Sequence, residues 1–398
     1  MKIYEIGTGY TPIPAQMGAA TEIVVEELTR SFIKSGEDVT IIDIASDDRK
    51  DTDLPIIEVK VPRVFAKKDV SLGIMHKLKR VVYSIALAGK LNEILRRTNE
   101  KVVLHFHNQY NLFFFLKLMQ KKIRMNAVVV YTVHSYIWHG KWDEIKNTIN
   151  RRYFQEVYCL KRADKVFVLN ELTKYNIANH INVDGDRIHL INNGVNTNVY
   201  SALKDYERSE LKKQYDMMEK KVFVQVGSVC DRKNQLASVE LLLPLMKKNN
   251  NIVFCYAGGI ISPEYQASIE RFAELNGVQE QIKYVGELKP GKQLNDFYNL
   301  AEAMIFPSKA EGFSLVIIEA MSAGIPVIIN HTLQFKLANE CLQYSDQDSF
   351  AHIVNDQILI PSKRQVLSKK AYESVIGKYS WDAVAKSILL FLGNVLSL

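Results

Sequence analysis

Cysteine and long apolar runs are scarce in this chain. Its 398 residues include four cysteines, and no pair has the C-x-x-C spacing. We therefore expect buried free thiols in a reducing compartment rather than disulfides or a zinc site. No stretch approaches the roughly 18 apolar residues that a membrane span needs. The segment from Met1 to Gly7 carries an acid and lacks the apolar core of a signal peptide, which predicts a cytoplasmic protein.

The excess of positive charge is concentrated in one segment. Residues 60–100 contain ten Lys or Arg and three acids, so that 10 − 3 = +7 equals the net charge of the whole chain. The stretch Lys77-Leu78-Lys79-Arg80 precedes an apolar run and predicts a helix with a basic flank. Two interpretations stay open, a solvated helix face or peripheral attachment to the anionic inner face of the cell membrane. Aromatic residues are not interleaved with the charges, so nucleic acid is not an expected partner.

Short apolar runs alternate with longer amphipathic stretches, the pattern of parallel βαβ units. The predicted strands are residues 2–6, 39–44, 56–61, 102–106, 127–133, 165–169 and 187–191, then 222–227, 252–257, 282–285, 303–306 and 326–329. The polar stretch Asn192–Asn198 separates the two series and reads as a hinge. The fold class is thus α/β, with two tandem doubly wound, Rossmann-like domains at 1–195 and 196–378. Such sheets bind ligands beyond the carboxyl ends of their strands, so the crevice between the domains is the expected site.

The strongest motif runs from Phe306 to Ile329. Between Ser314 and Ile329 the only charge is Glu319, and a carboxylate within an apolar helix is costly unless it is paired. The amides of Gly312, Phe313, Ser314 and Leu315 would lie at a helix N-terminus, with Ser314 as N-cap, and could bind a diphosphate. Glu319, one turn later, could then accept hydrogen bonds from a ribose, and Glu311 would lie near a sugar beyond the diphosphate. The alternative is a core helix whose glutamate faces solvent.

This motif, P-S-x-x-E-G-F-S-L-x-x-x-E-A-M-x-x-G-x-P-V-I, resembles the signature of retaining glycosyltransferases with the GT-B fold. The most similar group is family 4, which builds bacterial capsules, exopolysaccharides and glycolipids. Further similarities lie at residues 163–170, at Ile191-Asn192-Asn193-Gly194-Val195-Asn196, at residues 284–286 and in the tail around Trp381. The resemblance implies an acceptor-binding first domain, a nucleotide-sugar-binding second domain and an interdomain cleft. It also implies that a C-terminal helix, residues 379–398 with Ser380 as N-cap, crosses back to the first domain.

Two glycine-bearing loops extend the resemblance. The segment from Val226 to Asn234 is similar to the family's G-R-x-x-x-x-K-G loop, whose cations hold the donor diphosphate. Lys233 matches the family's lysine and Arg232 could supply a second cation, whereas Ser228 replaces an arginine and Asn234 a glycine. In the first domain Gly18 matches a glycine loop that lies against the donor phosphates. The alternative for the Lys233 loop is a charged surface turn.

Three histidines follow two neighbouring strands of the first domain. The resemblance places His107 beside the donor sugar and His134 on the acceptor side. Because side chains alternate between the two faces of a strand, we predict that only one of His105 and His107 faces the cleft. A metal site at these histidines is therefore not expected.

Together these features predict a retaining hexosyltransferase that needs neither metal nor another cofactor. The donor would be a UDP- or GDP-sugar and the acceptor a glycan or a lipid-linked molecule, in capsule, exopolysaccharide or cell-envelope glycan synthesis. The resemblance implies that His107, Lys233 and Glu311 are catalytic, and that the leaving phosphate takes the proton of the acceptor hydroxyl. Two alternatives stay open, a nucleotide-sugar epimerase and an inactive GT-B scaffold or regulatory subunit.

Overall fold

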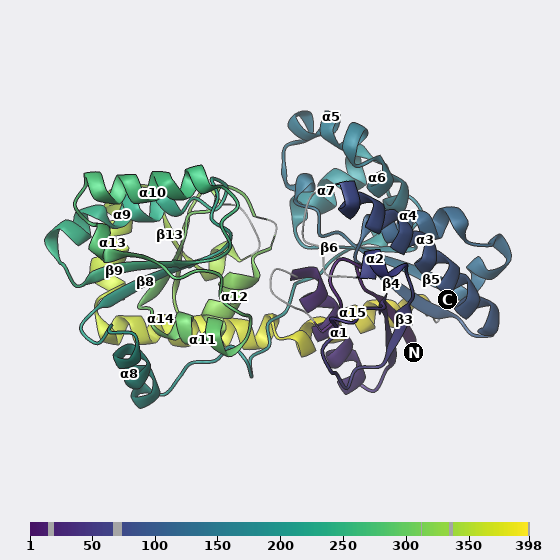
Figure 1. The fold of residues 1–398 in the computed structure, drawn as a ribbon, viewed down its shortest axis with the longest axis horizontal. Coiled ribbons are helices and arrows are strands. Elements are labelled where there is room, and N and C mark those ends of the chain that lie inside the picture. Colours follow the sequence, from purple (N-terminus) through teal and green to yellow (C-terminus); the bar gives the residue numbers. More distant parts are fainter. Residues whose placement is uncertain (15–19, 67–73, 312, 334–336, 397–398) are drawn as a thin grey trace. The chain divides into compact units, whose positions relative to one another are not determined.

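The chain forms two compact units in the computed structural model, which describes residues 1–14, 20–66, 74–311, 313–333 and 337–396 (Figure 1). Unit 1 comprises Met1–Gly194 and Trp381–Leu398, and unit 2 comprises Val195–Ser380. From the sequence we placed the two boundaries after residues 195 and 378. Each unit is an α/β layer structure with its own parallel sheet and its own apolar core.

Unit 1 contains a seven-stranded parallel sheet in the order β3-β2-β1-β4-β5-β6-β7. Strands buried on both faces read as continuous apolar runs, which is why the sequence located all seven to within two residues at either end. Their bounds are β1 Lys2–Ile6, β2 Asp38–Ile44, β3 Ile56–Val59, β4 Val102–Phe106, β5 Ala127–Thr132, β6 Lys165–Val168 and β7 Ile188–Leu190.

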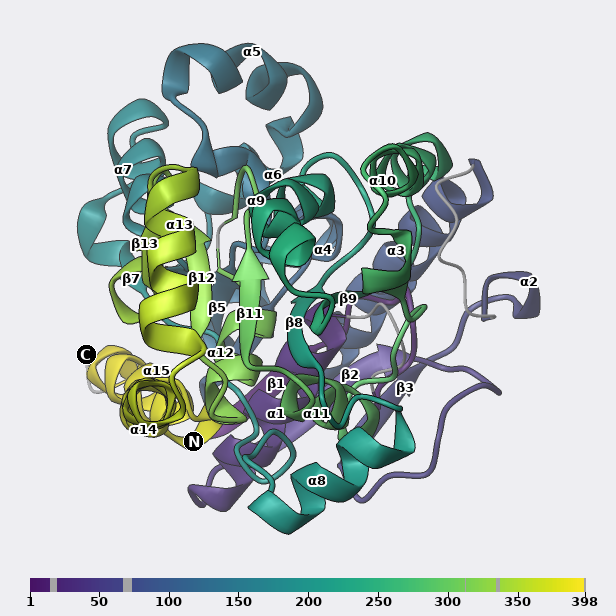
Figure 2. The same cartoon turned by 90° about the vertical axis from the view of Figure 1, so that its left-hand side faces the viewer.

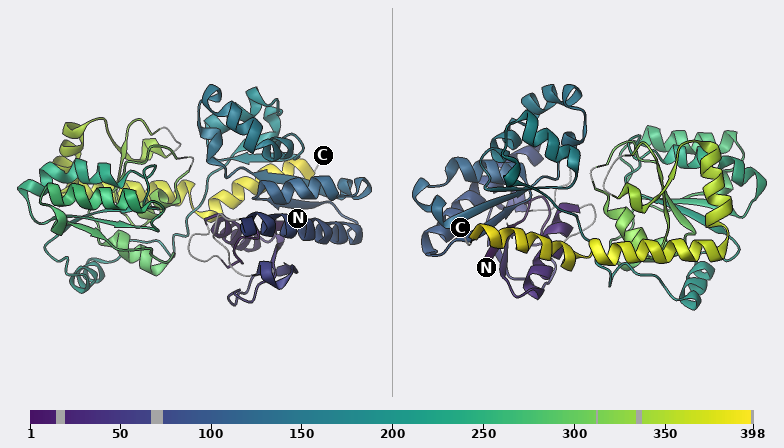
Figure 3. Two further views of the ribbon diagram at one scale, coloured as in Figure 1. Left: turned by 45° about the horizontal axis from the view of Figure 1, so that its top comes forward. Right: turned by 180° about the vertical axis from the view of Figure 1, so that it is seen from behind.

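Helices cover both faces of the unit 1 sheet. On one face α1 packs against α15, and on the other α3 packs against α4 and α4 against α6 (Figure 3). The helices are α1 Ala20–Lys34, α2 Arg63–Ala66, α3 Ile74–Arg97, α4 Gln109–Leu118, α5 Trp142–Arg152, α6 Phe154–Leu160, α7 Glu171–His180 and α15 Trp381–Leu396. The tail therefore returns to unit 1, as the resemblance implied.

Unit 2 contains a six-stranded parallel sheet in the order β10-β9-β8-β11-β12-β13. The strands are β8 Lys221–Val226, β9 Ile252–Ala257, β10 Ile282–Tyr284, β11 Ala303–Phe306, β12 Val327–Asn330 and β13 Leu342–Tyr344. The sequence did not predict β13. Only three residues long, it is the edge strand beside β12, and Gln343 interrupts its apolar pattern.

Helices also sandwich the unit 2 sheet. Figure 2 shows α9, α10 and α13 on one side of the strands and α11, α12 and α14 on the other. The bounds are α8 Asp205–Gln214, α9 Gln235–Lys248, α10 Pro263–Leu275, α11 Lys292–Asn299, α12 Leu315–Ser322, α13 Gln347–Ile353 and α14 Pro361–Lys378.

The chain passes between the units at two neighbouring points. The Val195 amide donates to the Tyr379 carbonyl oxygen at 2.7 Å, which ties the two passages together. On the other side, a Cβ on Gly194 would lie 2.4 Å from the Trp381 ring. Only glycine allows this approach, so the hinge glycine is needed to seat the first turn of α15.

All four cysteines are free thiols, as predicted from their spacing. Cys159 and Cys255 are buried, whereas Cys230 and Cys341 are half-buried. Within the described residues, no helix combines the length and the apolarity that crossing a bilayer requires.

Candidate functional site

The two strongest motifs of unit 2 meet at the switch point of its sheet. The strand order reverses direction between β8 and β11, and such a reversal opens a crevice at the carboxyl ends of the strands. The loop after β8 carries Arg232 and Lys233, and the loop after β11 carries Glu311. Glu311 Oε1 lies 2.7 Å from Lys233 Nζ and 2.8 Å from Arg232 Nη1. The acid and both cations singled out from the sequence are therefore one cluster.

Backbone and side-chain hydrogen bonds fix the two loops against each other. Ser308 Oγ donates to Glu311 Oε1 at 2.6 Å, and the Lys309 amide donates to the Arg232 carbonyl oxygen at 2.9 Å. Asn234 has a left-handed backbone with φ of 58°. Asparagine tolerates this conformation better than most residues, which explains how it can replace the family's glycine. The Lys233 loop is therefore held against the loop after β11 by hydrogen bonds.

The Lys233 side chain is largely shielded from water. Its side chain is 12% exposed, and Nζ lies 5.1 Å from the centre of the Phe306 ring. Burial lowers the pKa of Lys233, while the Glu311 carboxylate opposes that shift. A cation with this little access to water attracts an incoming anion more strongly than a fully solvated one.

Glu319 lies in α12, where its carboxyl group is half-buried. Tyr298 donates to Glu319 Oε2 at 2.9 Å, and the Tyr200 hydroxyl also hydrogen bonds to this carboxyl group. Burial raises the pKa of Glu319 to about 7, although both tyrosines lower it. The interpretation of Glu319 as a glutamate that faces solvent is therefore wrong, because its carboxyl group accepts hydrogen bonds from two tyrosines of unit 2.

The other residues of the motif surround the start of α12. Ser314 is at the N-cap position but its side chain makes no cap hydrogen bond, so it does not occupy the first-turn amides. Phe313 packs toward the Tyr379 ring at 6.1 Å, and half-buried Leu315 begins the helix. Ser228 is half-buried at the carboxyl end of β8. Gly312 lies outside the described residues.

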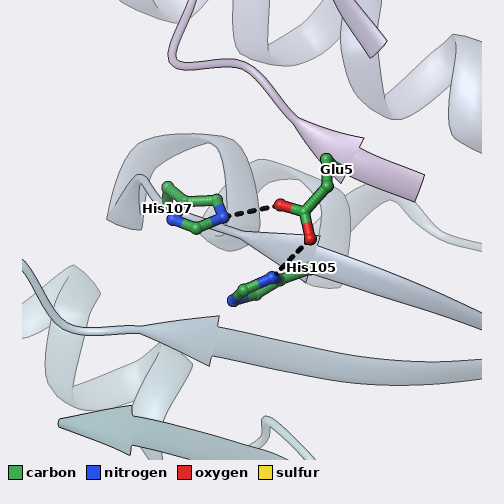
Figure 4. A group of neighbouring side chains, drawn as sticks. All are labelled: Glu5, His105 and His107. Carbon is green, nitrogen blue, oxygen red and sulfur yellow. Dashed lines mark hydrogen bonds and ion pairs between the residues drawn. The ribbon is translucent and has the colours of Figure 1, made fainter. Parts of the chain in front are cut away.

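Unit 1 has a corresponding switch point between β1 and β4, and a buried polar network lies there. Glu5 on β1 is in register with His105 on β4. Glu5 Oε1 is 2.7 Å from His105 Nδ1 and Glu5 Oε2 is 2.8 Å from His107 Nε2 (Figure 4). The network continues from His107 Nδ1 to His134 Nε2 at 3.0 Å and from His105 Nε2 to Thr132 Oγ1 at 2.7 Å.

The protons of this network follow from its charges. Burial alone would raise the pKa of Glu5, but interaction with His105 and His107 lowers it to about 2, so Glu5 is a carboxylate that only accepts. Burial lowers the pKa of His107 to about 4 and that of His134 well below its ordinary value, so both rings are neutral at pH 7. His107 therefore donates Nε2–H to Glu5 and accepts at Nδ1 from His134 Nε2–H. This pattern leaves His134 Nδ1 as an acceptor.

Glu5, His105 and His107 also have the composition of a metal-binding triad, with ligand atoms within 4.8 Å of one another. Direct nitrogen–oxygen distances of 2.7 and 2.8 Å are those of charge-assisted hydrogen bonds. All three side chains are at most 4% exposed. We therefore interpret the group as a hydrogen-bonded network that orients His107.

Our reason for expecting only one of His105 and His107 at the cleft is wrong, although of the two only His107 lines a pocket of unit 1. Residues two apart on a strand share a face, and both rings contact the same carboxylate. Glu5 itself was missed. The signal was present, because Glu5 is an acid inside an apolar first strand and the argument from costly buried charge applies to it as it does to Glu319.

A pocket of about 410 Å³ opens above this network, within unit 1. His107 and His134 contribute to its wall, together with Tyr10, Arg80 and Tyr110. Arg80 was expected on an outward basic flank, either solvated or facing a membrane, but it is half-buried in this wall. Lys79 is only 3% exposed and donates to the Tyr10 carbonyl oxygen at 3.1 Å. Both residues turn inward, which corrects that part of the basic-flank interpretation; Gly18 lies outside the described residues.

Two family models match the chain. Glycosyltransferase Family 4 matches residues 21–199, and Glycosyl transferases group 1 matches residues 207–374. The O-antigen chain mannosyltransferase of Salmonella typhimurium is 24% identical over 313 residues, which cover 77% of each chain.

Solved structures are similar over nearly the whole chain. Sucrose-phosphate synthase from Thermosynechococcus elongatus superposes with a TM-score of 0.72 at 18% identity and covers 100% of this chain and 99% of its own. An Anabaena protein crystallised with UDP and glucose gives a TM-score of 0.69 at 14% identity, over 98% of this chain and 99% of that one. With the two-unit fold and the Glu311–Glu319 motif, these matches show that the chain belongs to the GT-B glycosyltransferases of family 4, also called group 1.

Proposed function

We propose that this glycosyltransferase moves a hexose from a UDP- or GDP-sugar to a glycan or lipid-linked acceptor, with retention of configuration and without a metal. The observation that carries the proposal is the cluster of Lys233, Arg232 and Glu311 at the unit 2 switch point. The loop that carries Glu311 leads directly into α12, the helix that contains Glu319. The proposed setting is the synthesis of a bacterial capsule, exopolysaccharide or cell-envelope glycan. The mannosyltransferase relative and the UDP complex of the structural neighbour are consistent with this class of donor.

The charges of the cluster fit a diphosphate. Without ligand, Glu311 pairs with both cations through a single oxygen atom, so one positive charge of the cluster is not balanced by it. A nucleotide diphosphate brings negative charge that can take over Lys233 and Arg232, which frees Glu311 to accept a hydrogen bond from a hydroxyl of the transferred sugar. Glu319 would accept hydrogen bonds from the ribose, and the first-turn amides of α12 would face the phosphates.

The same cations supply the chemistry. In the transfer step the bond between the anomeric carbon and the diphosphate oxygen breaks, and negative charge develops on the leaving phosphate. Lys233 and Arg232 stabilise that charge in a site with restricted access to water. The leaving phosphate takes the proton of the acceptor hydroxyl as the new glycosidic bond forms on the same face. His107, held neutral by its surroundings, would hydrogen bond to a hydroxyl of the donor sugar by exchanging its contact with His134 for that hydroxyl.

Slow donor hydrolysis tests the proposal. The protein is incubated with a panel of UDP- and GDP-sugars, and the release of free sugar and nucleotide is followed by chromatography. We expect turnover of at least one donor and a loss of about 100-fold or more in Lys233→Ala, since removing one such electrostatic donor typically costs that much. Lys247→Ala, an exposed lysine on α9, is the matched control and should retain full activity.

The alternatives give different products. A nucleotide-sugar epimerase would convert one intact nucleotide-sugar into another without releasing sugar. An inactive scaffold, an interpretation based on Ser228 and Ala19 in place of the family's residues, would bind a nucleotide-sugar without hydrolysing it. Either result would refute the proposed transfer.

Peripheral membrane attachment through residues 60–100 also stays a proposal. It now depends on the exposed Lys77 and other outward basic residues rather than on Lys79 and Arg80. Binding to anionic vesicles that weakens at high salt and in Lys77→Gln would support it, and salt-insensitive binding would count against it.

A further inference from the structure

The described residues in the wall of the unit 1 pocket include cations but no carboxylate. Among the described residues that line it are two arginines, Arg80 and Arg152, and two histidines, but no aspartate or glutamate. Arg152 is exposed at the end of α5, and Arg80 reaches the pocket from α3. Within the described part of the chain, neither guanidinium makes an ion pair or a hydrogen bond, and Arg80 Nε is buried without a partner.

Aromatic rings hold Arg80 in place instead of a carboxylate. Its guanidinium lies 4.8 Å from the centre of the Tyr10 ring and 5.2 Å from that of Tyr110. Such stacking fixes the plane of a guanidinium while leaving its N–H donors for a ligand in that plane. An arginine whose only role was to stabilise the fold would be expected to find an acidic partner.

The rings themselves are anchored. Asn108 Nδ2 donates to the Tyr10 hydroxyl at 2.8 Å, and Lys79 holds the Tyr10 carbonyl oxygen. Asn108 also caps α4, because its Oδ1 accepts from the Tyr110 amide at 2.9 Å. Tyr10, Arg80 and Tyr110 therefore form a rigid arrangement, and little conformational entropy is lost when a ligand binds to it.

Two carboxyl groups lie behind the pocket wall, but they are already engaged. Glu5 accepts hydrogen bonds from two histidines, and Glu22 accepts one from Thr8. Both side chains are buried, so they do not contribute an accessible negative surface to the pocket.

We propose that this pocket binds a phosphate group of the acceptor, with Arg80 as the principal phosphate ligand and Arg152 at the rim. Two unpaired guanidinium groups match the two negative charges of a phosphate monoester, and the fork of Arg80 suits bidentate binding of its oxygens. The polar wall next to Arg80 and the volume of about 410 Å³ leave room for a hydroxylated ring beside the phosphate. The proposal rests on the proposed function in taking the ligand to be the acceptor, and it adds the chemical class that the acceptor belongs to.

Binding measurements in the absence of donor test it. Glucose 6-phosphate and glucose 1-phosphate are compared with glucose and glucuronic acid by titration calorimetry. We expect at least one sugar phosphate to bind about tenfold or more tightly than glucose, because a charge-assisted hydrogen bond contributes about that much. Arg80→Gln should abolish this preference, and Arg80→Lys should restore part of it, since a lysine keeps the charge without the planar fork.

Lys77→Gln is the matched control. It removes the same charge from the same helix, but Lys77 is exposed and does not line the pocket. We expect Lys77→Gln to bind sugar phosphates like the wild type. Circular dichroism and thermal melting of each variant establish that the fold is intact, and Arg80→Lys keeps the test decisive if Arg80→Gln unfolds.

A second experiment, the vesicle arm of the test, distinguishes a soluble acceptor from a lipid-linked one. Phosphatidylcholine vesicles with and without phosphatidylinositol 4-phosphate present a phosphate monoester on a hydroxylated ring that is attached to a lipid. Arg80-dependent binding of the soluble sugar phosphates indicates a soluble acceptor, and Arg80-dependent binding of the vesicles alone indicates a lipid-linked one.

Four results would overturn the proposal. They are no preference for phosphate in either arm, binding of glucuronic acid as tight as that of the sugar phosphates, equal losses of soluble sugar-phosphate binding in Arg80→Gln and Lys77→Gln, and an unchanged preference in Arg80→Gln. Donor hydrolysis is measured without any acceptor and does not involve Arg80 in the proposed mechanism. Hydrolysis that persists without a phosphate preference would leave the proposed function standing and reject only the acceptor class.

Discussion

Glu319 predicts a proton release that can be measured when the donor binds. Its pKa is about 7, so at pH 7 the carboxyl group is about half protonated in the free protein. Two ribose hydroxyls would donate only to the ionised form and would therefore lower that pKa. Binding of a nucleotide-sugar at pH 7 should then release about half a proton from Glu319. The affinity should weaken as the pH falls below 7, approaching about tenfold per pH unit.

The assay is titration calorimetry of UDP-glucose and GDP-mannose in buffers of different ionisation enthalpy. These donors lack a terminal phosphate that titrates near pH 7, so the buffer dependence reports on the protein. Other groups that exchange protons when the donor binds do so in the wild type and in Glu319→Gln alike. The contribution of Glu319 is therefore the difference between the wild type and Glu319→Gln.

Glu319→Gln also has a predicted effect on stability. A carboxyl group whose pKa is raised by folding stabilises the protein most below its unfolded pKa, and this contribution is lost as the pH rises through the folded pKa. The window runs from pH 4.5 to about 7, and at most about 3 kcal/mol of unfolding free energy is lost across it. Glu319→Gln should remove this decline. If the binding enthalpy depended on the buffer equally in both proteins, the ribose assignment would be refuted. Glu274→Gln, which removes an exposed acid, is the control.

Three further substitutions test the interactions that build the sites. Glu5→Gln should lower the free energy of unfolding by about 1–3 kcal/mol. It should also change the ring tautomer of one histidine, because only one of the two can still donate to an oxygen of residue 5. Unchanged nitrogen-15 spectra of the histidines would contradict the proton assignment. Glu302→Gln should lower the free energy of unfolding, measured by urea denaturation, by about 3 kcal/mol, because this buried carboxylate pairs with three cations at 2.6, 2.8 and 3.6 Å. A loss below about 1 kcal/mol would count against these ion pairs. Gly258→Ala should lower stability by about 2 kcal/mol and weaken donor binding, since its Cβ would lie 2.2 Å from the Gly227 carbonyl oxygen at the start of the Lys233 loop. Gly89→Ala, which has open space around it, is the control and should be neutral or stabilising.

The amino-acid sequence determined the fold class and most of the strands. Parallel strands buried on both faces must be nearly continuous apolar runs, and this signal does not depend on the rest of the chain. The single charge in the apolar stretch around Glu319 likewise marked a position with hydrogen-bond partners, because an unpartnered acid there would destabilise the helix. β13 was not predicted, since a three-residue edge strand takes its structure from pairing with β12 rather than from its own pattern.

The tertiary structure decided which side chains meet. Lys233 and Glu311 are 78 residues apart, and Glu5 and His105 are 100 apart. They come together because the order of strands reverses between β8 and β11 and between β1 and β4, and no local pattern encodes which strands become neighbours. Tertiary structure also decided which way the basic side chains of helix α3 point. Periodicity predicted the helix, but only tertiary contacts turned Lys79 toward the Tyr10 carbonyl oxygen and Arg80 into the wall of a pocket, beside Tyr10 and Tyr110.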